Sequence, residues 1–375
     1  MKDVVTILCS GFGLGFYIPG LLLEQQLKAL GIEVETEVFE SLMTDEKKSK
    51  TDESRNAYHA SFAIALGSQR IPADIRRSLD PNATAALLDR WIRQGRRHFI
   101  SLSGHWVHIL DMLRERGVTG IQADLLHVDS DLSPSWKQLQ KLNPYYAAPY
   151  REIELYDKEC MAVKFKIDVT GHQPLAYAER NGRLVLHGGG WGIGTYQQKA
   201  EELEQSGYGL DIAAYRTEDI VRHASSDRDY FMNDPQWRTW MRDAWDKLTF
   251  PPFARVPVEG RPDFRLHGAY HGVYDIIRTA AAVISKPGAG ALIDSLAATT
   301  PLVLLEPFGT HERKNAEIWK AQGFGIDFEE WRSLRFDRGV LERLHFNLLN
   351  ERSKSPDYAA HYAAELAVAD GRGQT

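Results

Sequence analysis

The sequence has little cysteine and no long hydrophobic run, and both absences narrow the classes of protein that it can encode. Its two cysteines, Cys9 and Cys160, stand far apart in 375 residues. That spacing gives neither a disulfide framework nor a metal knuckle. No apolar run approaches the ~20 residues that a membrane-spanning helix needs. The start, MKDVVTILCSGFG, enters a predicted strand without a signal-peptide pattern, so we expect a cytoplasmic protein.

Basic residues are not in excess either, since the formal net charge is −6. This balance argues against a general nucleic-acid binder, which would carry a basic surface. The residues are 43% hydrophobic and 26% charged, as in soluble globular proteins. A chain of 375 residues is too long for one ordinary core and suits two α/β domains.

Glycine is concentrated in three stretches that each follow a predicted strand and precede a predicted helix. They are SGFGLGF at 10–16, HGGGWGIG at 187–194 and SKPGAG at 285–290. Around the third stretch we expect a buried strand over 280–285, a helix over 291–298 and a second strand over 302–305. Strand, helix and strand in so short a space form a βαβ unit, which implies a parallel sheet.

The third stretch has the features of a phosphate site. Glycines let backbone N–H groups approach a ligand closely, and a helix N-terminus adds the positive end of a dipole. Lys286 adds a cation, and Asp294, about one turn into the helix, can accept a hydrogen bond from a ribose hydroxyl. The alternative is a tight turn that binds nothing, because Gly-x-Gly alone is a weak signal.

The two halves of the chain open alike, each with a strand, a glycine-rich turn and a helix. We therefore expect two doubly wound α/β domains with a cleft between them, at the carboxyl ends of their strands. The first domain is expected over 1–170 and the second over 180–340. A helical tail over 341–375 is expected to pack back toward the first domain.

The segment ISKPGAGALIDSLAATTPLVLLEPFGTHERKNAEIWKAQGFG, at 284–325, resembles the donor-binding domain of two-domain (GT-B) glycosyltransferases, especially the MurG-like and UDP-glycosyltransferase group. The pattern of this group is a strand, a small-residue loop, a helix with an acid, a strand led by proline and a polar loop ending in Asn-Ala. GFGLGFYIPGLLLEQQLKALG and VLHGGGWG resemble the glycine loops that open its two domains. The resemblance implies two Rossmann-like domains that face a cleft.

The resemblance also implies a site for a nucleotide-sugar donor, with UDP-sugar favoured, on the second domain. Ala289 and the glycines stand at positions that contact the diphosphate. Lys286 stands where plant members carry a phosphate-contacting histidine, and Asp294 stands where an acid contacts the ribose. The donor residues implied in this way are Gly189, Gly190, Tyr270, Lys286, Gly288, Ala289, Gly290, Asp294, His311 and Glu312.

Three of these residues stand where the group contacts the nucleobase or the sugar of the donor. Tyr270, in HGAYHGVYDII, stands where the group reads the nucleobase. His311 and Glu312 stand where a pair of side chains contacts the donor sugar. Asn315 is expected to begin the next helix as its cap.

The catalytic base is expected to differ from that of the group. Many UDP-glycosyltransferases carry a catalytic histidine three residues before the proline of the first glycine loop, and counting back from Pro19 reaches Phe16. We therefore expect His105, in SLSGHWVH, to take the proton, with Asp129 as the alternative base or as its orienting partner. The residues expected on the acceptor side are Gly13, Phe16 and His108.

Two further absences bear on the chemistry. No Asp-x-Asp stands at the donor loop, and the DSD at 129–131 lies in the first domain, so we expect no metal and metal-independent transfer. Retaining relatives place two glutamates with seven residues between them near the donor sugar. From Glu306 that count reaches Lys314, which favours inversion.

The sequence thus predicts a hexosyltransferase that uses a nucleotide-sugar co-substrate and no cofactor, and that acts on a hydroxyl or amine of a small secondary metabolite. Alternatives of the same fold are a sugar-nucleotide 2-epimerase, a glycosyltransferase for a lipid or cell-envelope acceptor, and a silent sugar-nucleotide-binding protein. A nicotinamide or flavin enzyme is suggested by GFGLG alone, but Phe16 fills the place of its last glycine.

Overall fold

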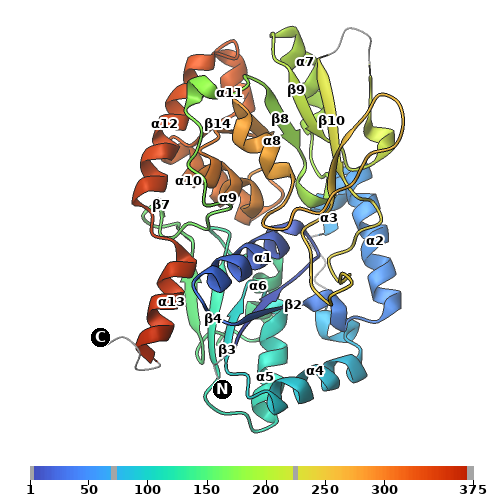
Figure 1. Ribbon diagram of the computed structural model, residues 1–375, viewed down its shortest axis with the longest axis vertical. Helices are drawn as coiled ribbons and strands as arrows, with labels where there is room; N and C mark the ends of the chain where they lie inside the picture. The colour runs from blue at the N-terminus through green and yellow to red at the C-terminus, as the bar shows by residue number, and fades with distance from the viewer. Residues whose placement is uncertain (1–3, 69–73, 223–226, 370–375) are drawn as a thin grey trace.

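The computed structural model describes residues 4–68, 74–222 and 227–369, which fold into two α/β units, each built on its own sheet (Figure 1). The sheet of the first unit has the order β2-β1-β3-β4-β5, and all its pairs are parallel. Its strands are β1 (Val5–Cys9), β2 (Val34–Val38), β3 (His98–Ser101), β4 (Gln122–His127) and β5 (Arg151–Glu154). Its helices are α1 (Leu14–Ala29), α2 (Asp45–Ala60), α3 (Phe62–Ser68), α4 (Pro81–Arg93), α5 (Val107–Glu115) and α6 (Pro134–Leu142).

The sheet of the second unit has the order β11-β10-β9-β8-β12-β13-β14, and only β10 with β11 is antiparallel. Its strands are β8 (Leu184–His187), β9 (Leu210–Ala213), β10 (Arg228–Asn233), β11 (Phe253–Val256), β12 (Ala282–Ser285), β13 (Leu302–Leu304) and β14 (Gly325–Asp327). The helices that follow are α7 (Ala200–Gln205), α8 (Val273–Thr279), α9 (Ala289–Ala298), α10 (Thr310–Ala321), α11 (Phe328–Ser333), α12 (Arg338–Lys354) and α13 (Tyr358–Ala369). A hairpin of β6 (Tyr156–Asp157) and β7 (Ala162–Val163) lies between the units.

The expected doubly wound α/β architecture with parallel sheets is therefore confirmed, and the βαβ unit predicted around the third glycine stretch is β12-α9-β13. Helix α9 begins at Ala289, two residues before the expected start, with Gly288 as its N-cap. Ala289 and Gly290 thus belong to the first helical turn, whose N–H groups lack intrahelical acceptors, rather than to the loop.

Strand order places the ligand-binding edge in each unit. In each unit, successive strands are added first toward one edge of the sheet and then toward the other. This reversal of strand order falls between β1 and β3 in the first unit and between β8 and β12 in the second. Loops at the carboxyl ends of such strand pairs leave a crevice, which is where open α/β sheets bind ligands. The loops concerned carry the glycine stretches after β1, β8 and β12, and also His105 after β3.

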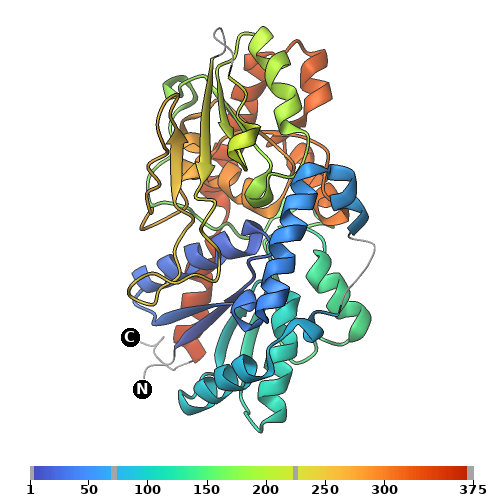
Figure 2. The same cartoon turned by 90° about the vertical axis from the view of Figure 1, so that its right-hand side faces the viewer.

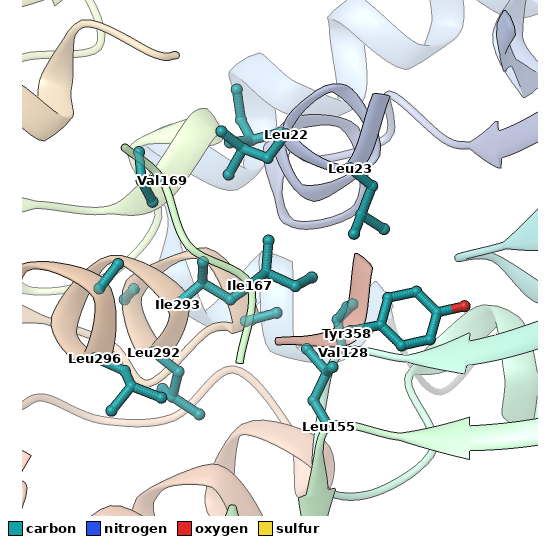
Figure 3. Close-up of a cluster of buried hydrophobic side chains, with 14 of the residues drawn as sticks. Leu22, Leu23, Val128, Leu155, Ile167, Val169, Leu292, Ile293, Leu296 and Tyr358 are labelled. Atoms are coloured by element: carbon teal, nitrogen blue, oxygen red, sulfur yellow. The ribbon is translucent and has the colours of Figure 1, made fainter. Parts of the chain in front are cut away.

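One hydrophobic cluster joins the two units (Figure 3). Leu22 and Leu23 of α1, Leu292 and Ile293 of α9, and Tyr358 of α13 are all buried in it. Full burial of a large apolar side chain contributes about 1.5–3 kcal/mol. The two sheets are therefore held together by a continuous core on the side of α1 and α9.

The chain crosses between the units a second time near its end. Helix α12 packs against α9 of the second unit, whereas α13 packs against α1 of the first. The Tyr358 hydroxyl donates to Asp124 Oδ2 at 2.8 Å, and Arg151 pairs with both Asp124 and Glu365. Helix α13 therefore covers the first sheet. In the described part of the chain, no helix combines the length and the apolar character needed to cross a membrane.

Candidate active site between the two sheets

The three glycine stretches meet where the two units face each other. A Cβ atom added to Gly190 would lie 2.4 Å from Leu14 Cγ, in the first turn of α1. One added to Gly15 would lie 3.9 Å from the Cβ of Ala289. The loop after β8 and the start of α9 thus both approach the start of α1, and a side chain at position 190 would collide with it.

Lys286 stands between the two glycine loops of the second unit. A Cβ on Gly189 would lie 3.9 Å from its Nζ atom, and one on Gly288 would lie 3.2 Å from it. The ammonium group forms an ion pair with Glu312 Oε1, and Glu312 Oε2 accepts a hydrogen bond of 2.6 Å from the Phe308 N–H. The structure therefore brings Gly189, Lys286, Gly288 and Glu312 together around one cation.

The first turn of α9 adds backbone donors beside this cation. Gly288 is the N-cap, and within the described residues no side chain caps the helix there. The free N–H groups and the positive end of the helix dipole attract an anion. Lys286 lies beside this helix start and adds a side-chain ammonium group to the backbone donors.

Asp129 is the residue of the first unit that faces the second unit at this site. It follows β4, is buried, and accepts a hydrogen bond of 2.7 Å from Asn315 Nδ2 of α10. The same Nδ2 donates to the Pro287 carbonyl at 2.9 Å. Burial raises the pKa of Asp129, although His311 and the hydrogen bond from Asn315 oppose that rise. A carboxyl group with a raised pKa binds a proton more strongly than an ordinary carboxylate.

The prediction that Asn315 caps a helix is wrong. Helix α10 begins at Thr310 with Gly309 as its N-cap, so Asn315 lies in its second turn. Its side chain faces the first unit, where its Oδ1 accepts from the N–H of Ser130 at 2.8 Å and from the Ser130 hydroxyl at 2.6 Å. The polar loop before α10 is shorter than expected, which moves His311 and Glu312 into the first helical turn.

Asp294 lies one turn into α9, where the sequence places it, but a second side chain holds it. His271 Nε2 donates to Asp294 Oδ2 at 3.0 Å, and both residues are buried. Tyr270, next to His271, donates instead to Asp275 Oδ1 of α8 at 3.0 Å and packs on the His267 ring. Tyr270 and Asp294 therefore have separate partners.

His105 lies in an aromatic surrounding on the first unit. Its ring centroid is 5.6 Å from that of Phe12 and 5.0 Å from that of Phe39. Burial, and to a lesser degree His108, lowers the pKa of His105 to about 3. Such a ring is neutral at pH 7 and is a weak proton acceptor. Its packing against two aromatic rings therefore suits a structural role better than the role of a catalytic base.

The remaining residues expected on the acceptor side lie on α1 and α5. Gly13 is the N-cap of α1, and Phe16 in its first turn packs on the shared hydrophobic cluster. His108 lies one residue into α5 and is half-buried, and burial, followed by the charge of Arg76, lowers its pKa. All of them lie beside the β1 and β3 loops.

Sequence reasoning missed Glu40, which organises the first glycine stretch. This fully buried carboxylate follows β2 and accepts from the Ser10 hydroxyl at 2.8 Å and from the Gly11 N–H at 2.6 Å. Burial raises its pKa, and those two hydrogen bonds oppose the rise. Its sequence signal is weak, because it is a glutamate two residues after a strand, VETEV, that already alternates valine with polar residues.

A bridge formed by α2 was also missed (Figure 2). This helix of the first unit extends to the second, where His59 Nδ1 lies 2.8 Å from the Gly192 carbonyl and Nε2 lies 3.0 Å from Asp219 Oδ1. On the same helix, Asp52 pairs with Arg238 at 2.9 Å. The bridge closes one end of the boundary between the units. Over residues 4–68, 74–222 and 227–369, no three His, Cys, Asp or Glu side chains form a group that suits a metal ion.

Comparison with known proteins places this arrangement among two-domain glycosyltransferases in fold. No protein-family model matches the sequence, and no curated protein matches it. The solved structure of the glycosyltransferase SnogD from Streptomyces nogalater is 14% identical, with 98% of this chain and 99% of that chain covered and a TM-score of 0.55.

Two further solved structures agree. SsfS6 of Streptomyces sp. SF2575, a glycosyltransferase complexed with thymidine diphosphate, is 12% identical over 98% of this chain and 100% of its own, with a TM-score of 0.56. MurG of Acinetobacter baumannii is 13% identical over 98% and 99%, with a TM-score of 0.55. At such identities the likeness concerns the fold, and it confirms the expected GT-B fold.

Proposed function

We propose that this protein transfers a hexose from a nucleoside-diphosphate sugar to a hydroxyl or amine of a small-molecule acceptor. The observation that carries the proposal is the meeting of Lys286 and the start of α9 with Asp129 of the first unit, joined through Asn315. The site thereby offers the Lys286 ammonium group, which Glu312 holds in place, and the start of α9 to a diphosphate, with a carboxylate across from them. The GT-B fold supports this division of labour between the two units.

The donor side stabilises the leaving group. As the bond between the anomeric carbon and the diphosphate breaks, negative charge grows on the phosphate oxygens. Lys286 and the N–H groups of Ala289 and Gly290, in the first turn of α9, already lie at that place, so little reorganisation is needed. The diphosphate that this site would take belongs to UDP, which the sequence resemblance favours, or to thymidine diphosphate, which SsfS6 binds.

The acceptor side supplies the base. We assign this role to Asp129, because it contacts the second unit through Asn315 and burial raises its pKa. The acceptor's O–H or N–H proton passes to the carboxylate while its oxygen or nitrogen attacks the anomeric carbon from the face opposite the diphosphate. The transfer then inverts the anomeric configuration and needs no metal ion. His105, held in place by its packing on Phe12 and on the buried Phe39, forms a neutral part of the wall for the acceptor.

A release assay tests the proposal. The purified protein is incubated with UDP-sugars and thymidine diphosphate sugars, with and without a panel of hydroxylated aromatic and aliphatic acceptors. We expect release of the nucleoside diphosphate that depends on an acceptor, together with a glycosylated product of inverted configuration by NMR. Alteration of the donor's own sugar without any acceptor would identify a 2-epimerase instead. Binding without any turnover over the whole panel would contradict enzymatic transfer.

A further inference from the structure

The α2 bridge reaches the second unit at the glycine loop that follows β8 (Figure 2). His59 lies in the last turn of α2, and its side chain is 9% exposed. Its Nδ1 atom lies 2.8 Å from the Gly192 carbonyl oxygen, and its Nε2 atom lies 3.0 Å from Asp219 Oδ1. Both ring nitrogens are therefore within hydrogen-bond distance of an oxygen of the second unit.

The protonation state of His59 follows from the chemistry of these two oxygens. A backbone carbonyl oxygen only accepts hydrogen bonds. Burial raises the pKa of Asp219, but the hydrogen bonds from His59 and the Arg216 N–H outweigh it, and the pKa lies below its usual range. Asp219 is therefore ionised at pH 7 and only accepts as well. To make both bonds, the imidazole must donate from both nitrogens, which requires its protonated, positively charged form.

Asp219 is fixed with one oxygen toward His59. Its Oδ2 atom accepts from the Tyr215 N–H at 3.2 Å and from the Arg216 N–H at 2.9 Å. Oδ1 is the oxygen that His59 contacts. The carboxylate is thus held by the backbone of its own loop and faces α2.

Two arginines near the ring act in the opposite sense to Asp219. The His59 ring packs on the Tyr215 ring, with centroids 4.6 Å apart. The guanidinium groups of Arg55 and Arg216 lie 5.9 and 5.6 Å from the centroid of the same tyrosine ring. Like charges disfavour a protonated imidazole, whereas the carboxylate in direct contact with it favours the proton. Because Coulomb attraction falls with distance, the contact with Asp219 at 3.0 Å dominates.

The contact with Gly192 connects His59 to the diphosphate loop. Gly192 has a φ of +59°, and a Cβ added to it would lie 2.8 Å from His59 Nδ1. Its N–H donates to the Gly189 carbonyl at 3.1 Å. A Cβ on Gly189 would in turn lie 3.9 Å from Lys286 Nζ. His59 therefore holds one end of a tight turn whose other end borders the cation of the donor site.

We propose that protonated His59 positions the glycine loop 188–192 for the donor diphosphate, so that donor affinity is highest while this imidazole carries its proton. This inference rests on the proposed function, since it takes the diphosphate to bind beside Lys286. When the ring loses its proton, one nitrogen becomes an acceptor that faces another acceptor, and one of the two contacts across the boundary breaks. The donor must then order the loop itself, which lowers its apparent affinity.

The test is calorimetry of the full chain with UDP and thymidine diphosphate from about pH 6 to about pH 9, a range that spans the titration of imidazole side chains. The wild type should bind its preferred diphosphate roughly 10-fold more weakly at the upper end than at the lower end, as expected for one lost hydrogen bond. His59→Gln offers one N–H donor group to two acceptors. It should bind weakly at every pH and lose the wild-type decline.

Asp219→Asn separates the proton from the contact. Its amide oxygen can take the hydrogen bonds of Oδ2, which leaves its NH2 group facing His59 Nε2. A neutral His59 accepts that bond at Nε2 while Nδ1 still donates to Gly192. Donor affinity should therefore no longer fall as pH rises. A bridge with a merely structural role would show no such change in the pH profile.

A matched control uses a histidine away from the boundary between the units. His361 of α13 lies 3.3 Å from Glu365, so His361→Gln also removes an imidazole beside a carboxylate, and it should keep the wild-type pH profile. Thermal denaturation of every variant shows whether it folds. A wild type with the same affinity at every pH, or a folded His59→Gln or Asp219→Asn that keeps the decline, would overturn this inference alone. A wild type that binds neither diphosphate at any pH would overturn the proposed function together with it.

Discussion

Asn315 Nδ2 of α10 donates a hydrogen bond of 2.7 Å to Asp129 Oδ1, and this contact joins the carboxyl ends of the two sheets. The other end of the same amide accepts from the N–H of Ser130 at 2.8 Å. One side chain of the second unit thus fixes the carboxylate assigned as the base. The position of the base therefore depends on how the two units are docked.

The first prediction concerns Asp129. A positioned base contributes roughly 10²–10⁴-fold to a rate, so Asp129→Asn should lower kcat by at least about 100-fold and leave donor affinity intact. Initial rates and calorimetry with the nucleoside diphosphate measure the two quantities. Asp131→Asn is the matched control, because Asp131 pairs with Lys137 and Lys158 rather than with α10. Near-normal turnover of Asp129→Asn with a large loss in His105→Ala would return the base to His105.

The second prediction concerns pH. The base acts only when ionised, and burial raises the pKa of Asp129, so the acid limb of kcat/KM should fall at a pH above the ordinary aspartate value of about 3.9. The rate should be full above that limb and lost as pH decreases through it. A pH profile of the wild type measures the midpoint, and the limb should be absent from the residual rate of Asp129→Asn. A limb that persists unchanged in that variant would assign it to another group.

The third prediction concerns Glu312, which pairs with Lys286 and accepts from the Phe308 N–H. Glu312→Gln keeps an acceptor for Phe308 but removes the charge opposite Lys286. We expect a change of roughly 10-fold in kcat/KM for the preferred donor and an altered ranking of donor sugars. Glu317→Gln, on the same helix and paired with Lys314 at the surface, is the control. An unchanged ranking would remove Glu312 from sugar recognition.

The fourth prediction concerns the α2 bridge. Burial raises the pKa of Asp219, but the hydrogen bonds from His59 and the Arg216 N–H outweigh it, and the pKa lies below its usual range. A lowered carboxyl pKa stabilises the fold above the unfolded value of about 3.9, and this contribution is lost as pH falls through the folded pKa. Asp219→Asn should therefore cost about 1 kcal/mol at pH 7.

Urea denaturation at pH 7 and at about pH 3 measures this contribution. The difference between wild type and Asp219→Asn should shrink at the lower pH, where the wild-type carboxylate takes up its proton. Asp227→Asn serves as a control for an exposed aspartate of the same unit. A difference that grows at low pH would contradict the assignment.

The sequence alone predicted the features of the fold that depend on residues close together in the chain. The β12-α9-β13 unit and the glycine stretches were predicted because apolar runs, glycine and proline determine short-range structure. Asn315 was mistaken for a cap, since its partners Asp129 and Ser130 lie 186 and 185 positions away in sequence. His59 has no distinctive neighbours in sequence, and its contacts with Gly192 and Asp219 arise only when α2 packs against the second unit. Contacts between the two units join residues that are far apart in sequence, so a local sequence pattern does not predict them.

Helix α13 has a consequence for how the chain is made. It completes the covering of the first sheet through Tyr358, yet it follows the whole second unit in sequence. On the ribosome, the first unit emerges early but must wait for this helix with part of its hydrophobic surface open to water. The first unit therefore cannot complete its folding before the second unit is synthesised. Until then, its uncovered hydrophobic surface can lead to aggregation. The first sheet therefore gains its full cover only after α13 has been synthesised and has packed against α1.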